Sequence, residues 1–307
     1  MNKFAQMLAL DRTIVLDGGL ATQLESMGFD IDGDLWSAKL LDSNPQAIID
    51  AHRAYLDAGA DCIISASYQA SRRGFMAMGK SASEADELIA SAVMLAIAAR
   101  DQYVRDNPST DLSPLAAASV GPYGATVHDG SEYTGKYDVS RDELRSFHAE
   151  RLAVLDQCGA DVLAVETIPN ILEAEVLVDL LAEAKTPAWV SFACRDDANL
   201  SDGTPLSIAA KLYADHPTVL AVGINCTPPA FATSLIQALR RAVPNKAILA
   251  YPNSGETYHS SDNSWSGTAC DFDNAFNVRD WQDAGAKLIG GCCRTGPENI
   301  SAIRNLL

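Results

Sequence analysis

The sequence has 307 residues, which is enough for two domains of ordinary size or for one large α/β barrel. Its composition is 48% hydrophobic, as in soluble globular proteins, and its formal net charge is −17. This acidic charge argues against nucleic acid or an anionic membrane as the main partner, because both bind basic surfaces.

Short apolar runs along the chain predict strands. Each run is continuous rather than alternating in polarity, which is typical of strands buried on both faces. In chain order they occupy residues 13–19, 61–67, 115–121, 161–167, 188–194, 219–226, 247–253 and 286–292.

Helical segments are predicted between and after these strands. Asn44 and Pro45 place a capping residue before a proline at the first helical position, and Ser140 and Glu143 have the spacing of a capping box. The predicted helices span residues 44–60, 81–106, 140–160, 170–184, 207–216, 229–243, 274–286 and 297–307.

Eight strand–helix units in this length predict a single (β/α)8 barrel, one domain over residues 1–307. The alternative, a doubly wound open sheet, predicts a G-x-G-x-x-G phosphate turn after an early strand. The stretch "DGGLATQLE" at 17–25 lacks that spacing. The long connections at 121–139 and 252–273 are candidates for substrate lids.

The N-terminal stretch "MNKFAQMLALDRT" lacks the sustained apolar core and cleavage pattern of a secretory signal. No uninterrupted apolar run is long enough to span a bilayer. We therefore expect a cytoplasmic protein without a membrane partner, in which the seven cysteines are free, metal-bound or catalytic thiols.

Three cysteines follow strands whose carboxyl ends meet at one rim of the predicted barrel. Cys226 follows the sixth strand, and Cys292 and Cys293 follow the eighth. Three thiolates with one open position suit a catalytic Zn²⁺ ion, because soft sulfur ligands select zinc over magnesium or calcium. Such a site binds a substrate sulfur as the thiolate, and its electron-rich ligands favour alkyl transfer to sulfur over hydrolysis.

The alternative for any single cysteine is a small buried apolar residue. We favour that interpretation for four of the seven, of which Cys194 is the most plausible rival ligand because it also ends a strand: Cys62, Cys158, Cys194 and Cys270. A zinc-storage or redox-sensing protein could use the same three rim cysteines without catalysis.

Two carboxylates at the rim are candidates for substrate recognition. Asp17 and Glu166 could bind the ammonium group of an amino acid, and Gly18 and Gly19 allow close approach of its carboxylate to the backbone. Asn225 could orient a ligand or the substrate. The competing interpretations are a turn residue for Asp17, an ion pair with arginine for Glu166 and loop hydrogen bonding for Asn225.

The histidines are weaker candidates. We expect most of them at helix surfaces or in loops rather than as metal ligands, namely His52, His148, His216 and His259. The role of His128, in the long third loop, stays open.

Six motifs together closely resemble the homocysteine S-methyltransferases, from about residue 12 to the C-terminus. They are "DGGLATQLE", "SVGPYGATVHDGSEYTGKY", "AVETIPN", "VGINCTPP", "YPNSGE" and "GGCCRTGPENI". The resemblance implies a zinc-dependent (β/α)8 barrel related to betaine–homocysteine methyltransferase and to the homocysteine module of cobalamin-dependent methionine synthase.

The resemblance also implies roles for particular residues. Cys226, Cys292 and Cys293 would be the zinc ligands, Asp17 and Glu166 would hold homocysteine, and Gly18 and Gly19 would line its pocket. The third-loop motif resembles the branch that uses S-methylmethionine or S-adenosylmethionine as methyl donor. The tyrosines of that loop could contact the sulfonium by cation–π interaction: Tyr123, Tyr133 and Tyr137.

Several alternatives stay open at this point. The acceptor could be selenocysteine or another small thiol or selenol instead of homocysteine. The chain ends just after the last helix, without the C-terminal extension through which the betaine enzyme builds its oligomer, so a monomer is expected.

Overall fold

The computed structural model describes residues 2–29, 40–108, 113–127, 129–259, 264–267, 269 and 276–307. Within these ranges, eight parallel strands pair in the order β1-β10-β7-β6-β5-β4-β3-β2. A parallel bridge between Leu16 and Cys62 joins the first strand to the second and closes the ring. The strands are β1 (Ile14–Val15), β2 (Cys62–Ile64), β3 (Leu115–Val120), β4 (Val162–Ile168), β5 (Ala188–Phe192), β6 (Val219–Asn225), β7 (Ala247–Tyr251) and β10 (Ala286–Ile289).

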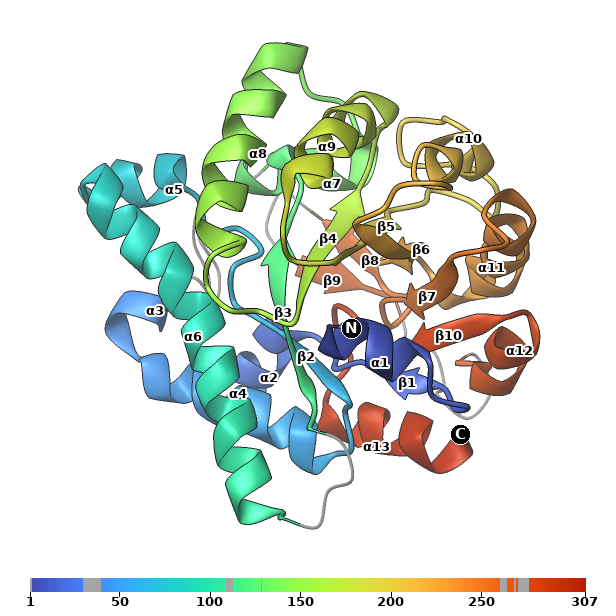
Figure 1. Ribbon diagram of the computed structural model, residues 1–307, viewed down its shortest axis with the longest axis horizontal. Helices are drawn as coiled ribbons and strands as arrows, with labels where there is room; N and C mark the ends of the chain where they lie inside the picture. The colour runs from blue at the N-terminus through green and yellow to red at the C-terminus, as the bar shows by residue number, and fades with distance from the viewer. Residues whose placement is uncertain are drawn as a thin grey trace.

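Each of the predicted helices is present, and together they surround the strands (Figure 1). They are α4 (Pro45–Asp57), α6 (Ala82–Asp106), α8 (Arg141–Leu155), α9 (Ile171–Glu183), α10 (Leu206–Lys211), α11 (Pro229–Ala242), α12 (Val278–Asp283) and α13 (Pro297–Leu306). Side-chain caps form at both predicted helix starts: Asn44 accepts the N–H of Ala47, and Ser140 accepts that of Glu143, which is the first of the two bonds of a capping box. The predicted (β/α)8 barrel is confirmed.

Short elements that the sequence patterns did not indicate fill the connections. They are α1 (Lys3–Leu8), α2 (Leu20–Ser26), α3 (Leu40–Ser43), α5 (Arg72–Ala77), the 3₁₀ helix η2 (Tyr123–Thr126), α7 (Ser131–Thr134) and the hairpin of β8 (Thr257–His259) with β9 (Ser264–Ser266). Most have four to seven residues, which is too short for a period of 3.6 to be recognised.

Helix α1 lies against the N-terminal end of the strands, in front of them in Figure 1. Its side chains Phe4 and Met7 join the apolar cluster inside the barrel, and the ring of Phe4 lies 5.8 Å from that of Trp189 on β5. Leu16 and Leu249 belong to the same cluster. Since this end is filled with apolar side chains, the carboxyl ends of the strands are left to form the site.

Three of the histidines expected at helix surfaces or in loops are instead buried, and that expectation was wrong for them. His52 on α4 and His148 on α8 are fully buried, and His216 is 7% exposed. The reason is helical spacing, since His52 follows the buried Ile48 by four residues and precedes the buried Leu56 by four.

The burial of His52 predicts a loss of stability in acid. Both ring nitrogens lack a hydrogen-bond partner among the described residues, and burial lowers the pKa of His52 from 6.5 to about 4. The unfolded chain therefore binds a proton below about pH 6.5 that the folded chain takes up only near pH 4. Stability from this residue is complete above pH 6.5, and about 3 kcal/mol is lost on going down to pH 4.

Urea unfolding of the wild type and of His52→Leu at pH 7 and pH 4 measures this effect. Leucine has a similar volume and cannot be protonated, so we expect the variant to lose about 3 kcal/mol less than the wild type over this interval. Equal losses in the two proteins would contradict the prediction.

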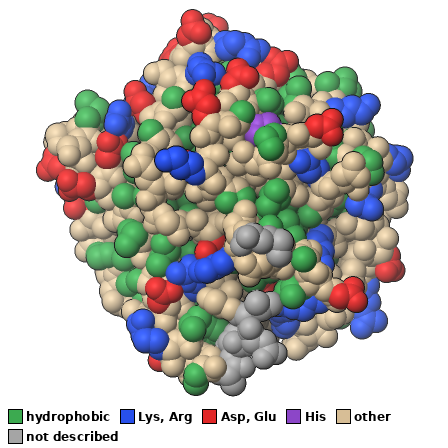
Figure 2. Space-filling view, in the orientation of Figure 1, with side chains coloured by type: hydrophobic (Ala, Val, Ile, Leu, Met, Phe, Trp, Pro, Cys, Tyr) green, Lys and Arg blue, Asp and Glu red, His purple; other side chains and the backbone are tan. Residues whose placement is uncertain are grey.

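Charged side chains of both signs are distributed over one face of the molecule (Figure 2). On the face in Figure 2, Lys and Arg side chains are interspersed with Asp and Glu rather than gathered in one basic area. Among the helices in the described ranges, none has the length and apolar character needed to cross a membrane.

Candidate active site

The three cysteines predicted to act together lie together at the carboxyl ends of β6 and β10. The Sγ atom of Cys226 is 2.9 Å from that of Cys292 and 3.3 Å from that of Cys293, and all three sulfur atoms lie within 4.8 Å of one another. Cys226 and Cys292 are 66 residues apart in sequence and follow different strands. The barrel therefore brings together ligands that no local motif could.

The sulfur atoms fit a metal ion of the kind predicted. Three thiols with mutually close sulfur atoms form a soft donor set, which selects zinc over hard cations. The rival ligand Cys194 is not part of this cluster in the described chain; it is 5% exposed, and its N–H is bonded to the Thr227 hydroxyl at 3.0 Å.

The thiols also interact with one another in a way that favours ionisation of one of them. Hydrogen bonds from Cys226 and Cys292 lower the pKa of Cys293 well below its usual range. The hydrogen bond of Cys292 with Cys226 raises the pKa of Cys292. A bound cation would favour the thiolate form of the remaining thiols, since metal binding releases their protons.

Backbone strain is concentrated at these strand ends. In the described ranges, the non-glycine residues with positive φ are Thr167 (63°), Cys226 (48°) and Arg294 (65°), and each is a predicted ligand or adjoins a predicted site residue. Such conformations cost about 1–3 kcal/mol each and persist where surrounding contacts enforce them. Asn253, for example, donates to the Cys226 carbonyl at 3.3 Å.

Asn225 makes some of the contacts that hold this strained backbone in place. Its Oδ1 accepts the N–H of Thr167 at 2.7 Å and the hydroxyl of Ser191 at 2.8 Å, and its Nδ2 donates to the Thr167 hydroxyl at 2.7 Å. The side chain therefore holds the turn that follows Glu166. Its Nδ2 also lies 3.9 Å from the Sγ atom of Cys292, and the residue does not line the cavity. Orientation of a metal ligand or of the substrate by Asn225 stays a prediction.

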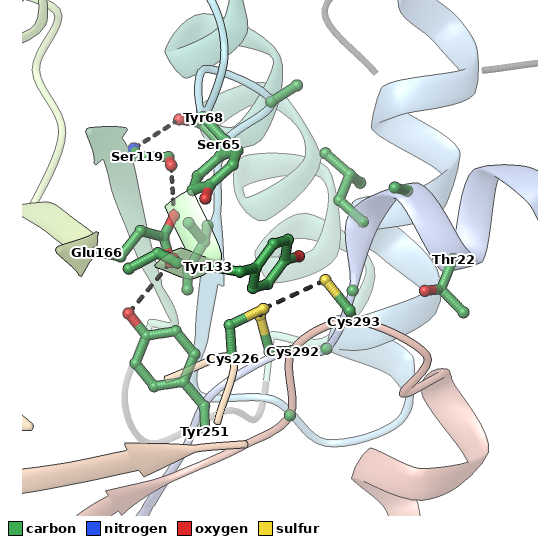
Figure 3. Close-up of a pocket in the computed structure, with 18 residues that line it drawn as sticks. Thr22, Ser65, Tyr68, Ser119, Tyr133, Glu166, Cys226, Tyr251, Cys292 and Cys293 are labelled. Carbon is green, nitrogen blue, oxygen red and sulfur yellow. Dashed lines mark hydrogen bonds between the residues drawn. The ribbon is translucent and has the colours of Figure 1, made fainter. Parts of the chain in front are cut away.

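A cavity opens beside the thiols, as the close-up shows (Figure 3). Glu166 is the one acidic side chain among its lining residues in the described chain, and no lysine, arginine or histidine lines it there. The lining residues are Gly18, Gly19, Leu20, Ala21, Thr22, Ile64, Ser65, Ala66, Tyr68, Ser119, Tyr133, Glu166, Thr167, Cys226, Tyr251, Gly291, Cys292 and Cys293.

Glu166 ends β4 with its carboxylate in the cavity wall. The Ser119 hydroxyl donates to Oε1, and the Tyr251 hydroxyl donates to Oε2 at 3.1 Å. Burial raises the pKa of Glu166 to about 7, although both hydrogen bonds oppose the rise. The described hydrogen bonds of Glu166 go to these hydroxyls, so the structure gives no support to the alternative of a direct pair with arginine.

Asp17 is 1% exposed and is not among the residues that line the cavity. Its Oδ2 accepts the N–H of Ile64 at 2.7 Å, while its Oδ1 has no hydrogen-bond partner in the described chain. Burial raises the pKa of Asp17 well above its usual range, and the nearby charge of Glu166 adds to the rise. A buried carboxylate oxygen without a partner is costly, and an ammonium group would satisfy it.

Comparison with known proteins identifies the family of this chain. The sequence model of the family described as homocysteine S-methyltransferase matches residues 14–307. Homocysteine S-methyltransferase YbgG of Bacillus subtilis is 46% identical over 306 residues, which cover 99% of this chain and 97% of that protein. The chain belongs to the homocysteine S-methyltransferase family. The predictions of this family and of an enzyme of its class are thereby confirmed.

Plant and structural relatives give the same result. Homocysteine S-methyltransferase 1 of Zea mays is 44% identical over 303 residues, which cover 95% of this chain and 94% of that protein. The metallated form of the homocysteine methyltransferase MmuM from Escherichia coli matches this methyltransferase fold with a TM-score of 0.89 and 42% identity over all of both chains.

Tyrosines form much of the remaining wall of the cavity. Tyr68, Tyr133 and Tyr251 line the cavity, and Figure 3 shows the ring of Tyr133 beside the thiols. Tyr68 and Tyr251 were not among the predicted site residues, although each follows or ends a strand. Tyr123 and Tyr137, the other predicted sulfonium contacts, do not line the cavity.

The buried side chain of Glu173 fixes the third loop, residues 121–139, against the barrel. Glu173 on α9 accepts the N–H of Tyr123 at 2.6 Å and the hydroxyl of Tyr137, and lies 2.7 Å from His148 Nε2. These contacts hold the loop that carries Tyr133. His128 and Cys270, which belong to the two long connections, lie outside the described residues.

Proposed function

We propose that this enzyme transfers a methyl group from a sulfonium donor to the thiol of homocysteine, forming methionine, with a zinc ion held by Cys226, Cys292 and Cys293. The observation that carries the proposal is the cluster of three sulfur atoms beside a cavity whose wall contains Glu166. When bound, zinc would supply a position for the homocysteine sulfur and favour its thiolate form at neutral pH.

The protein residues around the thiols would orient the acceptor. Glu166 and the unpartnered Oδ1 of Asp17 are suited to the ammonium group of homocysteine, because charge-assisted hydrogen bonds to carboxylates are strong in a buried site. Gly18 and Gly19 line the cavity and would present their backbone to the amino acid, because the space of a Cβ atom is taken by Thr295 at Gly18 and by Thr22 at Gly19.

The cavity also suits a cationic methyl donor. Its described lining contains tyrosine rings and one carboxylate and no basic side chain, so a sulfonium would meet no like charge. In the reaction the donor's methyl–sulfur bond breaks, its electron pair stays on the donor sulfur, and the acceptor thiolate supplies the pair of the new bond. The donor leaves as a neutral thioether, and the acceptor's thiol proton is released to solvent.

A discriminating experiment measures methionine formation from homocysteine with S-methylmethionine, S-adenosylmethionine and betaine as separate donors, each with and without a zinc chelator. We expect turnover with a sulfonium donor, no turnover with betaine, and loss of turnover on chelation. A zinc-loaded enzyme that forms no methionine with any donor, or turnover that resists complete removal of zinc, would contradict the proposal.

A further inference from the structure

The loop after β1 and the loop after β10 are fastened to each other. The N–H of Gly291 donates to the Asp17 carbonyl at 3.0 Å, and the N–H of Gly19 donates to the Thr295 carbonyl at 3.0 Å. The first loop carries the residues proposed to bind homocysteine, and the second carries two of the three cysteines. Substrate and metal positions are therefore parts of one hydrogen-bonded unit.

Tyr55 bridges this unit from outside the barrel. It lies on α4, is fully buried, and directs its hydroxyl at two carbonyl oxygens. These are the carbonyls of Gly19 at 2.8 Å and Thr295 at 2.9 Å, one from each loop. A single side chain thus spans the junction between the two loops.

The junction has no spare room. A Cβ atom added at Gly18 would lie 2.4 Å from the Thr295 carbonyl oxygen, and one added at Gly291 would lie 2.2 Å from the Thr295 hydroxyl. That hydroxyl donates to the carbonyl of Cys292 at 2.6 Å. A change in the distance between the two loops would therefore move Thr295 and, through its hydrogen bond, the backbone of Cys292.

We propose that Tyr55 is a positioning residue that sets Cys292 and Cys293 relative to the homocysteine-binding loop. This inference rests on the proposed function, because it assumes that the cysteines hold zinc and that the loop after β1 binds the acceptor. Groups that hold metal ligands in place typically contribute 10–100-fold to metal affinity, although they do not touch the ion. Tyr55 acts on zinc and acceptor together and not on the methyl donor.

The test is the zinc affinity of Tyr55→Phe, measured by competition with a chromophoric chelator, with Tyr213→Phe as the matched control. Tyr213 is also fully buried and donates to one carbonyl, that of Ala174 at 2.6 Å, but this carbonyl lies on α9 and not in either of the two loops. Both variants lose a buried hydroxyl and keep the ring. We expect about tenfold weaker zinc binding and a raised KM for homocysteine in Tyr55→Phe, with the donor KM unchanged, and wild-type values in Tyr213→Phe.

Variants of Thr295 test the same junction from the other loop. Thr295→Val removes the hydroxyl that donates to Cys292 and is expected to weaken zinc binding, whereas Thr295→Ser keeps the hydroxyl and is expected to restore it. Wild-type zinc affinity in Tyr55→Phe, or an equal loss in Tyr213→Phe, would overturn the inference while leaving the proposed function intact. A wild-type protein that fails to bind zinc would overturn both.

Discussion

Replacing Cys292 with alanine is expected to abolish zinc retention and methyl transfer. The substitution removes one of three sulfur donors that lie within 4.8 Å of one another, and two remaining thiols are too few for a stable site. A metal ion contributes several kcal/mol to such a reaction, so turnover should fall by about 10³-fold or more. Metal content after dialysis and methionine formation measure the two effects.

Cys194→Ala is the matched control for this prediction. Cys194 is a buried cysteine in the segment after β5, but it lies outside the sulfur cluster in the described chain. We expect this variant to keep one zinc ion per chain and near-wild-type turnover. A Cys292→Ala protein with full zinc content and full turnover would refute the assignment of the ligands.

Replacing Glu166 with glutamine is expected to lower kcat/KM for homocysteine by about 100-fold. The change keeps the shape of the side chain and removes the charge proposed to bind the acceptor's ammonium, which is worth about 1.5–3 kcal/mol. Zinc content should stay at the wild-type level. Steady-state kinetics with homocysteine as the varied substrate measure the loss.

The pH dependence of the same variant gives a second measurement. The carboxyl pKa of Glu166 is about 7, so the group is charged above pH 7 and neutral below it. An ammonium binds the charged form, and wild-type affinity for homocysteine should therefore fall as pH drops below 7. The affinity of Glu166→Gln for homocysteine lacks this dependence, so the ratio of wild-type to variant affinity should shrink as the pH drops below 7. Titration of the thiols affects both proteins equally, and the ratio therefore reports on Glu166 alone.

Glu132→Gln is the control for the loss of a buried carboxylate that does not contact the acceptor. Glu132 is 4% exposed and burial raises its pKa to about 7 as well, but it does not line the cavity. We expect it to change kcat/KM for homocysteine much less than Glu166→Gln does. Equal losses in the two variants would show that Glu166 acts through charge in general and not through contact with the acceptor.

The amino-acid sequence by itself determined the barrel and the rim at which the three cysteines lie. Continuous apolar runs followed by helical segments recur eight times, and in a parallel barrel the carboxyl ends of all strands meet at one rim. Cys226 and Cys292 were therefore predictable as neighbours, because strand membership alone decides on which end of the barrel they lie. The same argument placed Glu166 at this rim.

The tertiary structure alone decided how this site is held. The bridge from Tyr55 to Thr295 spans 240 residues, and the bond from Asn225 to Thr167 spans 58. Periodicity reports which face of an element is buried, but it does not report which side chain across the barrel a buried hydroxyl or amide meets. For that reason the sequence left open whether Asn225 orients a ligand or the substrate, and only the structure shows its amide bonded to Thr167 and 3.9 Å from the Sγ atom of Cys292. Tyr55 carried no signal at all, because its position on the inner face of α4 is that of an ordinary core residue.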